Sequence, residues 1–128
     1  MGLRLNRRAF EYAKSLVLQG NYMYDERDAW SEHQPTAEDE NEFIHLHGID
    51  EYARWYLGIN DDRAKNTKAA YEFPYGDFKV VHRCGILSAE SRAAQYKHQD
   101  IASAVAHLHG MIEAQPRAIR ERAHSRRP

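Results

Sequence analysis

Apolar and polar side chains alternate with helical spacing over much of this chain. Residues 6–19 predict the first helix, with Asn6 as its N-cap and Gly20 as the residue that ends it. The apolar face of this helix consists of Ala9, Phe10, Tyr12, Ala13, Leu16 and Val17.

Residues 77–114 predict two longer helices that form the spine of the fold. Asp77 is the expected cap of the first, and Cys84 continues its apolar face. Gly85 lies inside this pattern and indicates either a helix break or a close approach by another part of the chain. The second helix carries a narrow apolar stripe of Ile101, Val105, Leu108 and Ile112 and ends before Pro116.

The middle of the chain predicts shorter helices. Thr36 followed by acidic residues indicates a helix start, and further short helices are expected at 51–57 and 67–72. Residues 21–35 have no clean period and are expected to form an aromatic-rich loop packed on the body. No segment has a convincing strand pattern. The predicted class is therefore all-α, a compact single-domain bundle of about five or six helices.

Composition is that of an ordinary globular protein, with 42% hydrophobic and 29% charged residues among 128. We expect a helical domain at 1–116 and a basic, arginine-rich C-terminal tail at 117–128. No apolar run reaches the roughly 18 residues that a membrane-spanning helix needs, so no membrane association is expected. The single cysteine cannot form an internal disulfide, which favours a cytoplasmic location.

A metal site is the first chemical possibility. Glu42 and His45 form a Glu-x-x-His step that places a carboxylate and an imidazole on one helix face. A di-iron site needs two such steps, and the sequence has one. A tertiary cluster of Glu42 with His33, His45, His82 or His98 would suit zinc or iron. The alternative is that these histidines are structural, and the sequence identifies no cofactor.

Asp77, His82 and Arg83 are the candidates for acid–base catalysis. Cys84 follows closely, but it continues an apolar face and is expected to be an inert core thiol. Together with Arg92, His82 and Arg83 would also suit binding of an anion or a carboxylate. The alternative is ordinary salt bridges to the acidic body, each of which contributes little.

Trp30, Trp55 and Arg92 are the candidate binding residues, because aromatic and arginine side chains are enriched at interfaces. Arginines concentrate at both ends of the chain, so nucleic acid is a further possible partner. The body is acidic, however, and the expected recognition helix carries only Arg92 and Lys97 as cations.

Four segments resemble a small family of uncharacterised bacterial proteins: KSLVLQGNY (14–22), WSEHQP (30–35), YEFPYGDFKVVHRCG (71–85) and SRAAQYKHQDIASA (91–104). The resemblance covers most of residues 10–113. It implies a stand-alone single domain and no particular activity, cofactor or catalytic set.

The leading functional hypothesis is a small cytoplasmic binding or interaction protein. Its partner would be a second copy, held through the Ser/Ala-rich face of residues 88–94, or another protein. The alternative is a small enzyme or metal-dependent protein with a His/Glu/Asp site between residues 30–47 and 77–83. A further alternative is a nucleic-acid-binding regulator that uses the basic ends.

Overall fold

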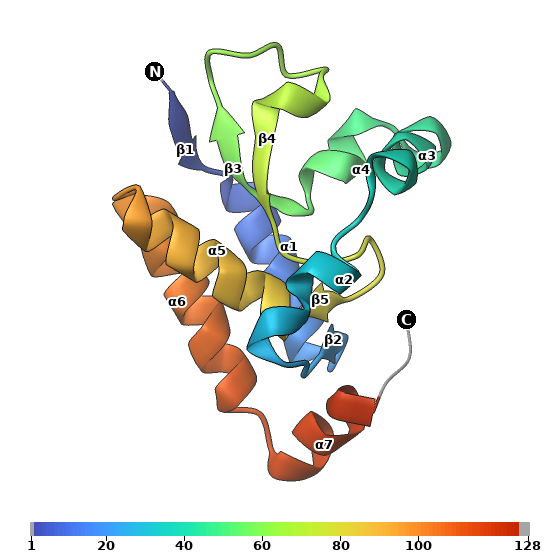
Figure 1. The fold of residues 1–128 in the computed structure, drawn as a ribbon, viewed down its shortest axis with the longest axis vertical. Helices are drawn as coiled ribbons and strands as arrows, with labels where there is room; N and C mark the ends of the chain where they lie inside the picture. The colour runs from blue at the N-terminus through green and yellow to red at the C-terminus, as the bar shows by residue number, and fades with distance from the viewer. Residues whose placement is uncertain (1, 126–128) are drawn as a thin grey trace.

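The computed structural model describes residues 2–125 and combines helices with two small sheets (Figure 1). In chain order the elements, with 3₁₀ turns labelled η, are β1 (Leu3–Leu5), α1 (Arg7–Leu18), β2 (Tyr22–Met23), η1 (Arg27–Ala29), α2 (Trp30–His33), α3 (Ala37–His47), α4 (Ile49–Ala53), β3 (Tyr56–Asn60), η2 (Lys68–Ala70), β4 (Tyr71–Pro74), β5 (Val81–His82), α5 (Arg83–Gln95), α6 (Gln99–Glu113) and α7 (Arg117–Ser125).

The all-α prediction, and with it the helical bundle, is wrong, because the fold is mixed α/β. An antiparallel sheet has the order β1-β3-β4, and β3 occupies part of the segment predicted as the helix 51–57. Gly58, the residue that follows this predicted helix, lies inside β3. A Cβ there would be 3.0 Å from Leu3 and 3.1 Å from Phe73, so this strand is covered closely by side chains of its neighbours. The buried run Tyr56–Leu57 has no alternation that would reveal a strand.

A short parallel pair, β2 with β5, makes the second sheet. Tyr22 is paired with Val81 and Met23 with His82. This register places the chain that follows β2 beside the start of α5, although the two segments are about sixty residues apart in sequence. The candidate site described below lies at this junction of the two segments.

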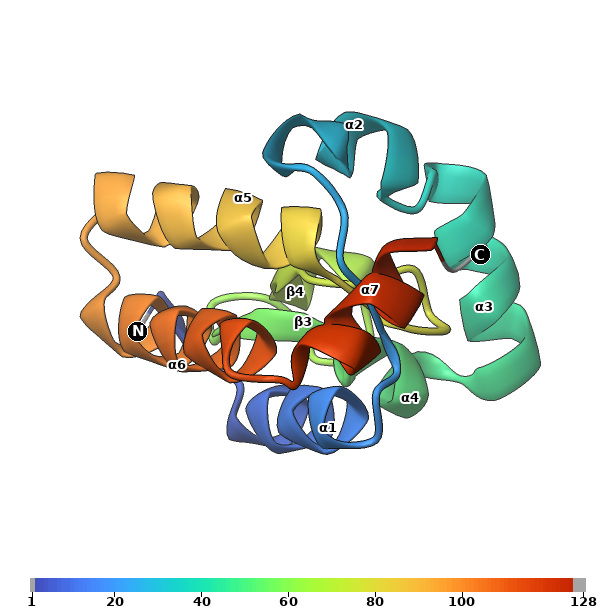
Figure 2. The same ribbon diagram turned by 90° about the horizontal axis from the view of Figure 1, so that it is seen from below.

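The predictions of helices at the positions of α1 and α6 are confirmed. Asn6 caps α1 by accepting a hydrogen bond from the backbone N–H of Ala9 at 3.4 Å. Its side-chain amide also donates to the carbonyls of Ala53 and Tyr56, which ties α1 to the chain leading into β3. The stripe predicted on α6 is fully buried: Ile101, Val105, Leu108 and Ile112. Figure 2 shows α5 and α6 side by side, with α1 packed beyond α6.

The first spine helix begins later than predicted. Asp77 does not cap a helix at 78; its Oδ1 instead accepts from the N–H groups of Lys79 and Val80 in a turn. Helix α5 starts at Arg83 and continues through Gly85 without a break. A Cβ on Gly85 would lie 2.9 Å from the Trp30 ring and 3.0 Å from the Tyr75 carbonyl. Of the two interpretations of Gly85, the close approach is confirmed.

The arginine-rich C-terminal segment forms α7, and Ala123 on this helix is buried against the core. Residues 126–128 of the predicted tail lie outside the described residues. Within the described part, no helix is both long and apolar enough to cross a membrane.

Candidate metal centre

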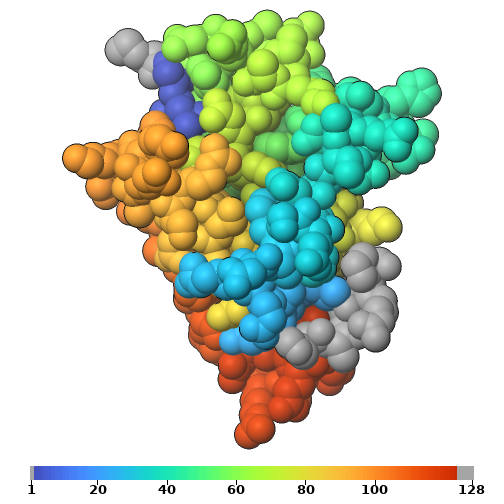
Figure 3. Space-filling view, viewed as in Figure 1, coloured from blue at the N-terminus to red at the C-terminus, as the bar shows by residue number. Residues whose placement is uncertain are grey.

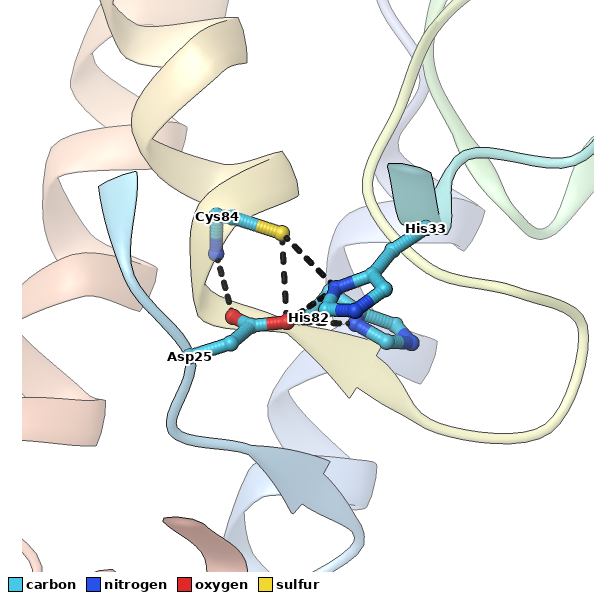
Figure 4. Close-up of side chains that lie close together, drawn as sticks. All are labelled: Asp25, His33, His82 and Cys84. Carbon is cyan, nitrogen blue, oxygen red and sulfur yellow. Dashed lines mark hydrogen bonds and ion pairs between the residues drawn. The ribbon is translucent and has the colours of Figure 1, made fainter. Parts of the chain in front are cut away.

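Four side chains capable of binding a metal meet where β2, α2, β5 and α5 converge (Figure 4). They are Asp25, His33, His82 and Cys84, and their ligand atoms all lie within 4.8 Å of one another. Asp25 comes from the chain after β2, His33 from the end of α2, and the other two from the β5–α5 junction.

Asp25 lies at the centre of the cluster. Its Oδ2 is 2.7 Å from His82 Nδ1, 2.8 Å from His33 Nδ1 and 3.1 Å from Cys84 Sγ. Its Oδ1 accepts from the Cys84 backbone N–H at 2.8 Å. Helix α5 has no side-chain cap of its own, so this carboxylate caps it from a distant part of the chain.

His82 is fully buried and is held at both ring nitrogens. Nδ1 contacts Asp25, and Nε2 is 3.0 Å from Asp77 Oδ2. Burial lowers the pKa of His82, but the two carboxylates outweigh this effect and raise it to about 9. His82 is therefore a cation at neutral pH and donates a hydrogen bond from each nitrogen.

The pKa of Asp25 shifts in the opposite direction. Burial alone would raise it, but hydrogen bonds from His82 and Cys84 lower it to about 2. Burial first, and then the bond to Asp25, raise the pKa of the Cys84 thiol well above its usual value. In the metal-free state Cys84 is thus a protonated thiol, the opposite of an activated nucleophile.

Arg83 holds the Asp25 segment in place from outside the cluster. Its guanidinium donates to the Asp25 carbonyl at 3.0 Å and to Glu113 at 2.8 Å, and it lies over the Tyr24 ring. Burial alone would lower the pKa of Arg83, but the bond to Glu113 raises it above its usual value. This arrangement links the loop that carries Asp25 to the end of α6.

The structure brings several predicted site residues together. His33 and His82 belong to the cluster, Asp77 is the second partner of His82, and the Trp30 ring lies 6.2 Å from the His82 ring. Arg83 lies next to the cluster and donates a hydrogen bond to the Asp25 carbonyl. Glu42 is outside it but shares with His33 and Asp77 the lining of a neighbouring cavity.

The other predicted residues lie elsewhere. His45 is exposed on α3, so the Glu42/His45 step does not reach the cluster. Trp55 is buried in the core and stacks on Tyr75 at 5.5 Å. Arg92 lies over the Phe73 ring and lines, with Trp30, an open groove of about 380 Å³.

Sequence reasoning missed Asp25 and assigned Cys84 to the core. Cys84 is indeed buried, yet its sulfur faces polar atoms. The only local signal for Asp25 is its place directly after the aromatic run Tyr22–Tyr24, and such a signal identifies no ligand. The chain matches no protein-family model, no curated protein and no solved structure.

Proposed function

We propose that the protein binds one Zn²⁺ ion through Asp25, His33, His82 and Cys84. The supporting observation is the convergence of four ligand atoms of three chemical kinds within 4.8 Å. Carboxylate oxygen, imidazole nitrogen and thiolate sulfur are the ligands that Zn²⁺ takes in tetrahedral protein sites, at about 2.0–2.3 Å. In such a site the ligand atoms lie roughly 3.3–3.8 Å apart. Small side-chain movements from the observed positions would therefore be enough.

The surroundings of His82 support the proposal. If Nδ1 binds the ion, Nε2–H keeps its hydrogen bond to Asp77 at 3.0 Å. A carboxylate behind a histidine ligand fixes the orientation of the ring and makes it a stronger ligand. Asp77, predicted from the sequence as a catalytic residue, would then act as a positioning residue.

The alternative of a cysteine nucleophile has weaker support. His33 Nδ1 lies 3.6 Å from Cys84 Sγ, but the thiol donates to Asp25 and its pKa is raised. A nucleophilic cysteine needs a lowered pKa and access to substrate, and Cys84 is fully buried. Metal binding instead displaces the thiol proton, because thiolate is the metal ligand.

Four protein ligands favour a structural role for the ion. The ion would join the loop after β2 and the end of α2 to the start of α5, in the place now held by hydrogen bonds.

A thiolate ligand persists in a reducing compartment, so the proposal includes a cytoplasmic location. Dimerisation through 88–94 stays a prediction; Ala89 and Ala93 of that segment are buried inside the chain.

Metal-free protein titrated with Zn²⁺ against a chromophoric chelator tests the proposal. We expect one ion per chain, and at least about tenfold weaker binding in His33→Gln and Cys84→Ser. His45→Gln is the matched control, since this histidine is exposed on a neighbouring helix. The Co²⁺-loaded protein should show a thiolate-to-metal charge-transfer band that Cys84→Ser abolishes. Equal affinity of wild type, His33→Gln and Cys84→Ser would refute the site.

A further inference from the structure

A cavity of about 430 Å³ opens beside the metal centre, between α3 and the turn at residues 77–79. Figure 3 shows the cyan α2–α3 segment and the yellow turn meeting on one side of the molecule. The volume of the cavity lies within the range of about 300–1,000 Å³ typical of small-molecule sites. Six of its lining residues carry the argument: Asp39, Glu42, Phe43, Asp77, Phe78 and Lys79.

Two phenylalanines form the apolar wall of this cavity. The rings of Phe43 and Phe78 stack at 4.5 Å with an interplanar angle of 16°. Phe78 has a φ of 70°, a left-handed conformation that is rare for a bulky residue. The hydrogen bonds from Lys79 and Val80 to Asp77 hold the turn in this conformation. The ring of Phe78 is therefore fixed at the cavity.

The polar part of the lining has three carboxylates, those of Asp39, Glu42 and Asp77. The other polar groups are the Lys79 ammonium and the imidazoles of His33 and His47. The Asp77 carboxylate is engaged by His82, and Asp39 accepts from the Thr36 N–H in the α3 capping box. Glu42 forms no ion pair with any residue in the described part of the chain. Asp39, Glu42 and Phe43 follow each other at helical spacing and thus share one face of α3.

We propose that this cavity binds a small organic cation, an ammonium or guanidinium ion that carries an apolar group. The charged end would pair with Glu42, and the apolar part would lie against Phe43 and Phe78. The stacked rings offer apolar contact and Glu42 offers a negative charge, so the two parts of the lining suit the two parts of this ligand class. The inference rests on the residues of the cavity and does not require zinc at the neighbouring centre.

Three probes of similar shape separate charge from aromatic contact: benzylammonium, benzyl alcohol and benzoate. Titrations of the metal-free protein followed by NMR should show benzylammonium binding about tenfold more tightly than benzyl alcohol, with no saturable binding of benzoate. The resonances that shift should be those of α3 and residues 77–79. Benzoate binding as tightly as benzylammonium would overturn the proposal.

Substitutions at the cavity provide the second test. Glu42→Gln should weaken benzylammonium binding about tenfold, because a neutral amide replaces the one carboxylate of the cavity lining that has no hydrogen-bond or ion-pair partner among the described residues. Glu38→Gln is the control, since Glu38 is exposed on the same helix and outside the cavity lining. Phe43→Leu should also weaken binding. Unchanged affinity in Glu42→Gln, which leaves the core untouched, would contradict the proposal whatever Phe43→Leu does.

Discussion

The Asp25 carboxylate binds both the backbone and the side chain of Cys84, with its Oδ1 2.8 Å from the amide nitrogen and its Oδ2 3.1 Å from the sulfur. The two residues are separated by 59 positions, so this pair of contacts joins the loop after β2 to the first turn of α5. One side chain thereby caps a helix and organises the polar cluster.

Loss of the Asp25 charge should destabilise the metal-free protein. Asp25→Asn removes one of the two anions that contact buried His82, and breaking a buried charge pair completely costs about 3–5 kcal/mol. Because Asp25 lies at the edge of the core, we expect the free energy of unfolding, measured in urea, to fall by about 2–4 kcal/mol. Asp28→Asn is the control: this residue is exposed on η1, and its change should stay within about 0.5 kcal/mol.

Stability of the metal-free protein should fall on the alkaline side. The folded pKa of His82 is about 9, above the usual value of 6.5, so its stabilisation is fully present below about pH 6.5. It is lost as the pH rises through about 9. The loss of stability should be on the order of 3–4 kcal/mol, because the pKa of His82 rises from 6.5 to about 9 and each pKa unit corresponds to about 1.4 kcal/mol.

Urea unfolding between pH 6 and pH 10, with chelator present, measures this effect. His82→Gln should flatten the profile over that interval, whereas His47→Gln, at an exposed position of α3, should keep it. An equally steep profile in His82→Gln would exclude His82 as its source. The pKa of Asp25 is lowered from 3.8 to about 2, which predicts a separate loss of stability as the pH falls through this interval.

Cys84 should react slowly with thiol reagents in the native state. Its side chain is fully buried and the pKa of its thiol is raised, so little thiolate is both present and accessible. We expect native labelling by a disulfide reagent to be at least about 100-fold slower than labelling in urea. Comparable rates in the two conditions would show that the cluster opens readily.

Two glycines inside helices should respond oppositely to alanine. Gly85→Ala introduces a Cβ 2.9 Å from the Trp30 ring and 3.0 Å from the Tyr75 carbonyl, and should cost about 1–3 kcal/mol. Gly110 lies within α6, and apart from its chain neighbours and the backbone of its own helix, no atom of the described residues lies within 4 Å of such a Cβ. Gly110→Ala should therefore stabilise the protein, by up to about 1 kcal/mol. Melting temperatures of the two variants give the comparison, and a stabilised Gly85→Ala would disprove the close packing.

The helices were predictable where one face is buried, as in α6, or where the first turn carries a side-chain cap, as in α3. Asn6 and Thr36 start α1 and α3 as expected, and Thr36 forms a full capping box with Asp39. The strands were not predictable, because β2 and β5 have two residues each and are defined by each other. Such short elements leave no period in the sequence.

The site was predictable only in part, for a related reason. His33, Asp77 and His82 stood out by residue type, since few other residues perform acid–base or metal chemistry. Their grouping depends on the β2–β5 register, which no local spacing encodes. Asp25 resembled any other acid in a polar stretch, and only its long-range contacts distinguish it.

The parallel pairing of β2 with β5 also sets the order in which the site can be made during synthesis. A growing chain that ends before residue 81 carries Asp25 and His33 but has neither the strand that positions them nor their two partners. The helical hairpin α5–α6, with contacts close in sequence, forms quickly once it is made. The polar cluster forms only after β2 has paired with β5, about sixty residues further along the chain. Binding of the proposed Zn²⁺ ion would therefore follow synthesis of β5 and the start of α5.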